Sequence, residues 1–158
     1  MHTYELEKNI WTEDDFSVMG WHDSKIWGFL ADTEKFEFMV DLDYIFQWVH
    51  PQEGETYFKF WVAPVTMVFE NAYDILLDID SRQGELEVAD LHMENERKTK
   101  NGRLNEFDFR FECQEGDFKV SATGYKMYVR KAPILQSGQT LDFELRGGID
   151  FGRDFSRS

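Results

Sequence analysis

Two acidic pairs have a spacing that could support carboxylate chemistry. Alternate side chains of a strand lie on one face, so the members of an Asp-x-Asp pair would stand about 6.6–6.8 Å apart. Paired carboxylates of this kind can bind a hard cation such as Ca²⁺ or serve a glycosidase. They also occur on the solvated strand face of any acidic protein, and the full calcium-loop pattern is absent. The four residues are Asp41, Asp43, Asp78 and Asp80.

A histidine and an aspartate are adjacent at His22 and Asp23, near a predicted strand start. In a turn, the two side chains can act together as a general base or as metal ligands. In a regular strand they would point to opposite faces, and a capping or turn-closing pair is the alternative. One hypothesis is therefore a small-ligand or metal-binding protein, or a hydrolase. In it, His22 and Asp23 would meet Asp41 and Asp43 in one cleft.

No known cofactor or metal motif accompanies these residues. The other histidines lack ligand spacing to one another and to Cys113, the only cysteine. Glycine-rich phosphate loops and the GxSxG, CxxC and HExxH patterns are absent. Cys113 lies in a strand-like stretch, which indicates a buried or half-buried structural thiol. We therefore predict no cofactor and assign no metal site.

Aromatic residues are unusually frequent, since 15 Phe, 5 Trp and 6 Tyr make up 16% of the chain. Aromatic and β-branched residues favour pleated, half-buried surfaces. Trp48 and the stretch Tyr57–Trp61 could line a small-ligand cavity or fill the core. If exposed, Trp21 or Trp48 could instead anchor a protein partner.

Apolar and polar residues alternate with a period of two in six stretches, which predicts strands. Polar turn signals that contain glycine separate most of them. We therefore expect an all-β fold with minor helical content. Its architecture would be an antiparallel β-sandwich or barrel of about eight to ten short strands. The six stretches are 36–44, 57–63, 75–79, 107–113, 118–123 and 141–145.

Three local features refine this expectation. The clearest hairpin joins 107–113 to 118–123. The apolar phase shifts by one residue at Gly124, which predicts a β-bulge or a barrel corner. Short helical turns are expected over Thr12–Phe16, capped by its first residue, and over Phe46–Val49.

The chain has 158 residues, so residues 1–158 are expected to form a single domain with a frayed end near 152–158. Its 17 Lys and Arg stand against 31 Asp and Glu, which gives a formal charge of −14. This excess argues against nucleic acid and anionic membranes as partners. The charge permits a basic protein partner, or it provides solubility alone. The sequence shows no signal peptide, which would be a basic start followed by an apolar run, and no stretch of 18 apolar residues. A cytoplasmic location is therefore expected.

One concentrated group of basic residues lies late in the chain. We expect these cations to pair with acidic residues of neighbouring strands, and an anion site is the alternative. The group consists of Lys119, Lys126, Arg130 and Lys131.

A set of motifs from about residue 21 to residue 133 resembles a group of small bacterial proteins of uncharacterised function. The set reads Trp-His-Asp at 21–23, Asp-Leu-Asp-Tyr-Ile at 41–45, Phe-Trp-Val-Ala-Pro-Val-Thr at 60–66, Val-Phe-Glu-Asn at 68–71, and Gly-Tyr at 124–125. The resemblance implies a bacterial origin and a single domain. In size and charge alone, the chain is also similar to the immunity proteins that accompany polymorphic toxins.

These observations favour a non-enzymatic binding module for a basic protein partner, such as an immunity-like protein. Electrostatic steering would speed the encounter and an aromatic anchor, Trp21 or Trp48, would add affinity. A homodimer through an exposed strand edge is a further possibility. The expected charged contacts are Asp41, Asp43, Asp78 and Asp80.

Overall fold

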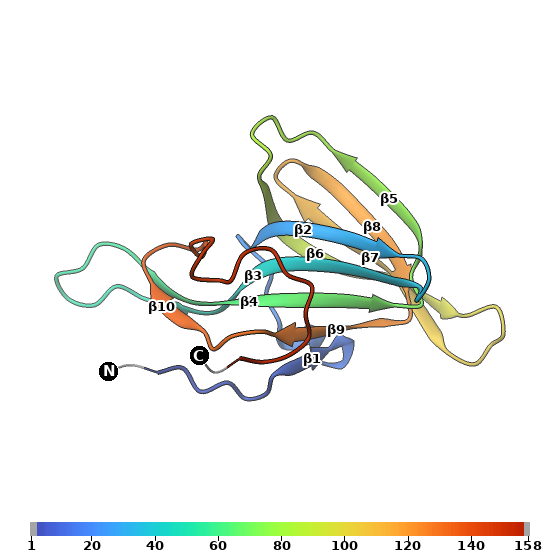
Figure 1. Ribbon diagram of the computed structural model, residues 1–158, viewed down its shortest axis with the longest axis horizontal. Coiled ribbons are helices and arrows are strands. Elements are labelled where there is room, and N and C mark those ends of the chain that lie inside the picture. The colour runs from blue at the N-terminus through green and yellow to red at the C-terminus, as the bar shows by residue number, and fades with distance from the viewer. Residues whose placement is uncertain (1–2, 157–158) are drawn as a thin grey trace.

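The computed structural model describes residues 3–156, and in these residues ten strands form one antiparallel sheet (Figure 1). This confirms the predicted all-β class with minor helical content, because a short 3₁₀ helix, η1, is the single helical element of that range. The elements are β1 (Ile10–Thr12), η1 (Glu13–Val18), β2 (Lys25–Asp32), β3 (Glu37–Val49), β4 (Lys59–Glu70), β5 (Tyr73–Ile79), β6 (Leu86–Lys98), β7 (Asn105–Cys113), β8 (Gly116–Ala122), β9 (Gly124–Val129) and β10 (Ile134–Gln136).

The sheet is open and folds over on itself. Its strand order is β1-β9-β4-β3-β2-β6-β7-β8-β5, and β10 adds to β4 beside β9. β2 and β6 pair only at their ends, Lys25 with Glu87 and Ile26 with Leu86, and then diverge. β1-β9-β4-β3-β2 therefore forms one layer and β6-β7-β8-β5 the other (Figure 1). β1 and β5 remain as the two ends of the sheet.

Aromatic rings fill the space between the two layers. The Phe69 ring of β4 lies 5.1 Å from the Phe109 ring of β7, and the Phe38 ring of β3 lies 6.2 Å from the Phe118 ring of β8. All four side chains are buried. Cys113 is buried beside them, as predicted, and burial raises the pKa of its thiol to about 12. The thiol is therefore a packing group.

Local predictions near the chain turns are largely confirmed. β7 and β8 form the predicted hairpin. The Thr12 side chain caps η1, and the Thr12 backbone N–H donates a hydrogen bond of 2.9 Å to the Asp15 carboxylate. At Gly124 the chain passes from β8 in one layer to β9 in the other, which is the predicted corner. The helical turn predicted for Phe46–Val49 is wrong, because these residues continue β3, and residues 47–49 pair with β4 after a bulge at Phe46.

The C-terminal segment, defined here as residues 137–156, crosses the outer face of β3 and β4 (dark red in Figure 1). The strand predicted for 141–145 is wrong. The backbone instead makes tight turns, in which the Arg146 N–H donates to the Asp142 carbonyl at 3.0 Å. Gly147 and Gly148 end these turns with positive φ values of 86° and 73°, a conformation that glycine adopts without strain.

The chain end that was predicted to fray makes specific contacts up to residue 156. Arg153 forms an ion pair of 2.6 Å with Glu37 of β3. The Ser156 N–H donates to the Arg130 carbonyl at 2.7 Å. Residues 157 and 158 of the predicted frayed end lie outside the described residues, as do residues 1 and 2.

Candidate functional site

The first acidic pair, Asp41 and Asp43, lies on the outer face of β3. Strand alternation directs Val40 and Leu42 into the core between the layers and the two aspartates away from it. The C-terminal segment covers that outer face, so both aspartates are 0% exposed. The prediction that they are charged surface contacts for a partner is therefore wrong.

Arg146 of the C-terminal segment joins both aspartates. Its Nη1 and Nη2 atoms donate to Asp41 at 2.9 and 2.6 Å, and its Nε donates to Asp43 at 2.9 Å. Burial alone would lower the pKa of Arg146, but the bonds and charges of the two aspartates outweigh it and raise the pKa. Arg146 is thus a permanent buried cation that holds the segment on the sheet.

Further donors saturate the same carboxylates. Asp41 accepts a bond of 2.9 Å from Arg130, whose other terminal nitrogen donates to Thr66 at 2.8 Å. Asp43 accepts bonds from Trp27 Nε1 at 2.8 Å and from the Leu141 N–H at 2.9 Å. Every carboxylate oxygen of the pair has a donor and both groups are fully buried, so the arrangement stabilises the fold and does not present the pair to a substrate.

His22 and Asp23 form the predicted turn pair, but the four-residue cleft is not formed. Asp23 adopts a left-handed backbone with φ of 67°, and His22 Nε2 lies 3.5 Å from its carboxylate. The second Asp23 oxygen accepts a bond of 2.8 Å from Gln139. The pocket of about 190 Å³ that Asp23 lines does not include Asp41 or Asp43. The hypothesis of one cleft with all four residues is therefore wrong.

The two tryptophans considered as aromatic anchors differ in exposure. Trp21 is 2% exposed and packs edge-on against Tyr44, with ring centroids 5.2 Å apart, so this alternative for the anchor is excluded. Trp48 is 39% exposed and stacks on the His22 ring at 6.1 Å. It remains available to a partner.

Glu87 of β6 belongs to the His22–Asp23 site and was not predicted from the sequence. A hydrogen bond with Asp23, then burial, and then the charges of Asp23 and Glu115 raise the pKa of Glu87. Two carboxylates this close disfavour the charged form of one of them, which is the cause of the raised value. Across residues 3–156, no group of three or more metal-ligating side chains has the geometry to hold a metal ion.

The second acidic pair lies at the end of β5, the strand at one end of the sheet: Asp78 is in the strand and Asp80 follows its last residue, Ile79. β5 pairs with β8 only, so its other edge is open among the described residues. Asp78 and Asp80 are exposed, as predicted for charged contacts. Apolar side chains of the same strand are also exposed, including Leu76 at 52% and Leu77 at 48%. β5 thus combines an open backbone edge, apolar side chains and carboxylates.

A groove runs between β5 and the diverging strand β2. It has a volume of about 400 Å³, and its apolar lining residues are Phe29, Leu77, Ile79 and Leu86. The Phe29 ring stacks on the buried Phe118 ring at 5.9 Å, so the groove floor continues into the core. Past Ile26, β2 pairs with β3 alone within the described part of the chain. Two open strand edges therefore border this groove.

A polar network on the outer face of β6, β7 and β8 gives the fold an acid-sensitive element. Asp108 accepts bonds from Asn95 and Ser121, each at 2.8 Å, and lies 3.0 Å from Arg97. Burial alone would raise the pKa of Asp108, but these donors outweigh it and lower the pKa to about 2.

We expect Asp108→Asn to weaken the dependence of stability on pH in acid. A lowered carboxyl pKa adds stability above the unfolded value of 3.8, and this is lost as the pH falls towards about 2. Denaturant unfolding from about pH 5 to about pH 2 should therefore show a stability gap between the two proteins that closes in acid. Exposed Asp80→Asn is the control and should track the unmodified protein. A constant gap would contradict the assignment.

No family model, curated protein or solved structure matches the chain. In residues 3–156, no helix is long and apolar enough to cross a membrane.

Proposed function

We propose that this protein is a non-enzymatic binding module that takes a cationic segment of a partner protein along β5. The exposed apolar side chains on a strand with an open edge carry this proposal. Long exposed edges invite pairing with another chain, and folded proteins ordinarily block them. Here the edge is seven residues long, from Tyr73 to Ile79. An added strand would gain backbone hydrogen bonds there, as in other cases of β-augmentation.

The side chains of β5 specify the kind of strand that would fit. Leu77 and Ile79 line the groove, whereas Asp78 and Asp80 are exposed beside it. Side chains of a paired strand alternate in the same way. A partner strand with apolar residues on one face and Lys or Arg on the other would therefore meet apolar and acidic groups in turn.

Charge favours a basic partner over a second copy of this chain. Each copy has a formal charge of −14, so edge-to-edge association of two copies would bring like charges together. A basic domain would instead be steered to the edge. The concrete form is a bacterial immunity protein in the cytoplasm that masks a basic toxin domain. The hydrolase or metal alternative loses its central carboxylates, because Arg146 and Arg130 engage Asp41 and Asp43.

A peptide of about ten residues that alternates Val and Lys is a direct probe of this edge. Titration calorimetry at low salt should show saturable binding to the unmodified protein. Charge reversal at Asp78 and Asp80 should weaken binding at least about tenfold, because rim carboxylates would then repel the lysines. The matched control reverses Glu5 and Glu53, which are exposed elsewhere. Both double variants raise the formal charge from −14 to −10, so net charge alone cannot explain a difference.

The same peptide with N-methyl groups on alternate residues separates strand pairing from simple charge attraction. N-methylation removes backbone donors while the lysine charges remain, so binding should fall sharply. A second test replaces Leu76 of β5 with Lys, which should weaken peptide binding. Leu104→Lys, at an equally exposed leucine outside β5, is the control and should leave binding unchanged. Equal binding by both peptides and by all variants would contradict the proposal, as would concentration-dependent dimerisation that Leu76→Lys abolishes.

A further inference from the structure

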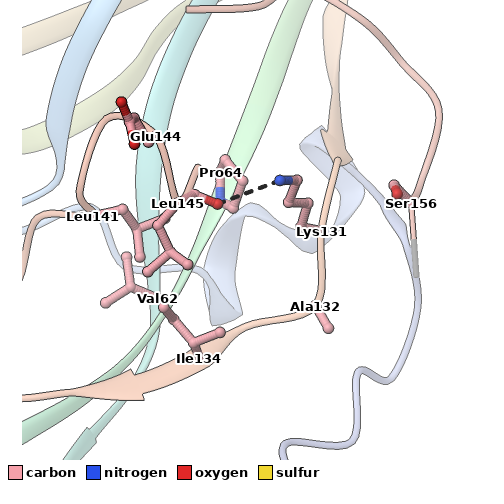
Figure 2. Close-up of a pocket in the computed structure, with 9 residues that line it drawn as sticks. All are labelled: Val62, Pro64, Lys131, Ala132, Ile134, Leu141, Glu144, Leu145 and Ser156. Atoms are coloured by element: carbon pink, nitrogen blue, oxygen red, sulfur yellow. Dashed lines mark hydrogen bonds between the residues drawn. The ribbon is translucent and has the colours of Figure 1, made fainter. Parts of the chain in front are cut away.

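A further pocket lies on the outer side of the molecule, away from the β5 groove. It has a volume of about 520 Å³, within the range of ligand sites, and lies between β4, β10 and the C-terminal segment (Figure 2). Most of its lining is apolar: Val62, Pro64, Ala132, Ile134, Leu141 and Leu145. Val62 and Leu141 are buried, so the floor is part of the packed protein.

One cation lies in this apolar lining. Figure 2 shows the Lys131 ammonium at the pocket, where it donates to the Leu145 carbonyl at 3.3 Å. Gly147 lies beside the ammonium, since a Cβ there would lie 3.5 Å from Nζ, and Lys131 itself is half-buried. No carboxylate of residues 3–156 is within ion-pair distance of Lys131, whereas Lys119, Lys126 and Arg130 each have an acidic partner.

We propose that this pocket binds an amphiphilic monoanion, an apolar chain or ring with a single carboxylate, and that Lys131 pairs with the carboxylate. A charge-assisted bond from one ammonium matches one carboxylate, and the apolar body would cover Val62, Ile134 and Leu141. Glu144 is the other charged residue of the lining, and its carboxylate lies across the pocket from Lys131 (Figure 2). Selection of the ligand would therefore rest on the ion pair with Lys131 and on the apolar contacts.

Octanoate and 1-octanol form a matched pair of probes that requires no protein variant. Titration calorimetry should show octanoate binding at least about tenfold tighter than the alcohol, because only the carboxylate pairs with Lys131. Lys131→Met should bring the two affinities together. Lys100→Met, in an exposed turn, should leave the octanoate preference unchanged. Affinities within twofold of each other in the unmodified protein would overturn the proposal.

Methyl NMR spectra would locate the bound probe. Octanoate should shift the methyl signals of Val62, Ile134, Leu141 and Leu145, which line the pocket. Shifts confined to the β5 residues Leu76 and Leu77 would overturn this site, since they would place octanoate on the edge groove. The absence of any shift up to about 10 mM octanoate would also overturn it. None of these results bears on the peptide test of β5, which uses a different surface.

Discussion

Replacement of Arg146 by methionine is expected to lower the free energy of unfolding by about 3–5 kcal/mol. Arg146 supplies three of the bonds to two fully buried carboxylates. Without it, Asp43 would keep no cationic partner and Asp41 would keep only Arg130. An uncompensated charge at a fully buried position is costly, because burial removes its hydration. Urea unfolding at pH 7, followed by circular dichroism, measures the loss.

Two variants isolate the cause of this loss. Arg103→Met makes the same chemical change in an exposed turn and should cost less than about 0.5 kcal/mol. Arg146→Lys keeps the charge but not the planar fork of donors, so its loss should be intermediate. The Arg146→Met protein should also be cut faster by trypsin at Arg153, because its C-terminal segment is less firmly held. Equal stability of the Arg146 and Arg103 variants would contradict the structural role.

Phe69→Ala is expected to cost a similar amount, about 3–5 kcal/mol. Phe69 is fully buried on β4 and its ring contacts rings from both layers, with centroids 5.1 Å from Phe109 and 5.8 Å from Tyr125. Truncation would leave a cavity between the layers, which rigid neighbouring rings cannot fill. The melting temperature should fall by about 10 °C, because about 2–4 °C is lost per kcal/mol in a chain of this size.

Tyr57→Ala is the control for Phe69→Ala. It also removes a large aromatic ring from a residue close to β4, but Tyr57 is 79% exposed. Calorimetric unfolding should therefore show a change within about 0.5 kcal/mol. A small effect at Phe69 would mean that the two layers do not share one packed core.

The strands that could be predicted are those with regular alternation and unbroken pairing. β7 and β8 pair without a register shift from Phe107 to Cys113, so their apolar residues keep a strict period of two. β6 was not predicted, because bulges between Val88 and Asp90 and between Glu94 and Arg97 break that period. Alternation with a period of two therefore predicts only those stretches of a strand that have no bulge.

The buried ion network could not be predicted from the Asp-x-Asp pattern alone. Asp41 and Asp43 have the same local pattern as Asp78 and Asp80, yet the first pair is buried and the second is exposed. The difference comes from Arg146, which lies 103 residues beyond Asp43 in the chain. Burial of a strand face depends on what packs over it, and periodicity carries no information on that.

The surface that we propose for partner binding could be predicted in part. Alternation over 75–79 identified β5, and Asp78 and Asp80 were predicted as exposed contacts. The open edge was not predicted, because it depends on the strand order that places β5 at one end of the sheet. Trp48 remained accessible while Trp21 did not, a difference that follows from tertiary packing alone.

Amide hydrogen exchange with and without the Val–Lys peptide tests the central claim most directly. If a cationic strand pairs with β5, the exposed-edge amides of residues 73–79 will exchange more slowly in the complex. Slower exchange at this strand, absent with the N-methylated peptide, is the predicted result. Protection confined to the surface around Trp48 and His22, or no change in residues 73–79 at saturating peptide, would contradict the account.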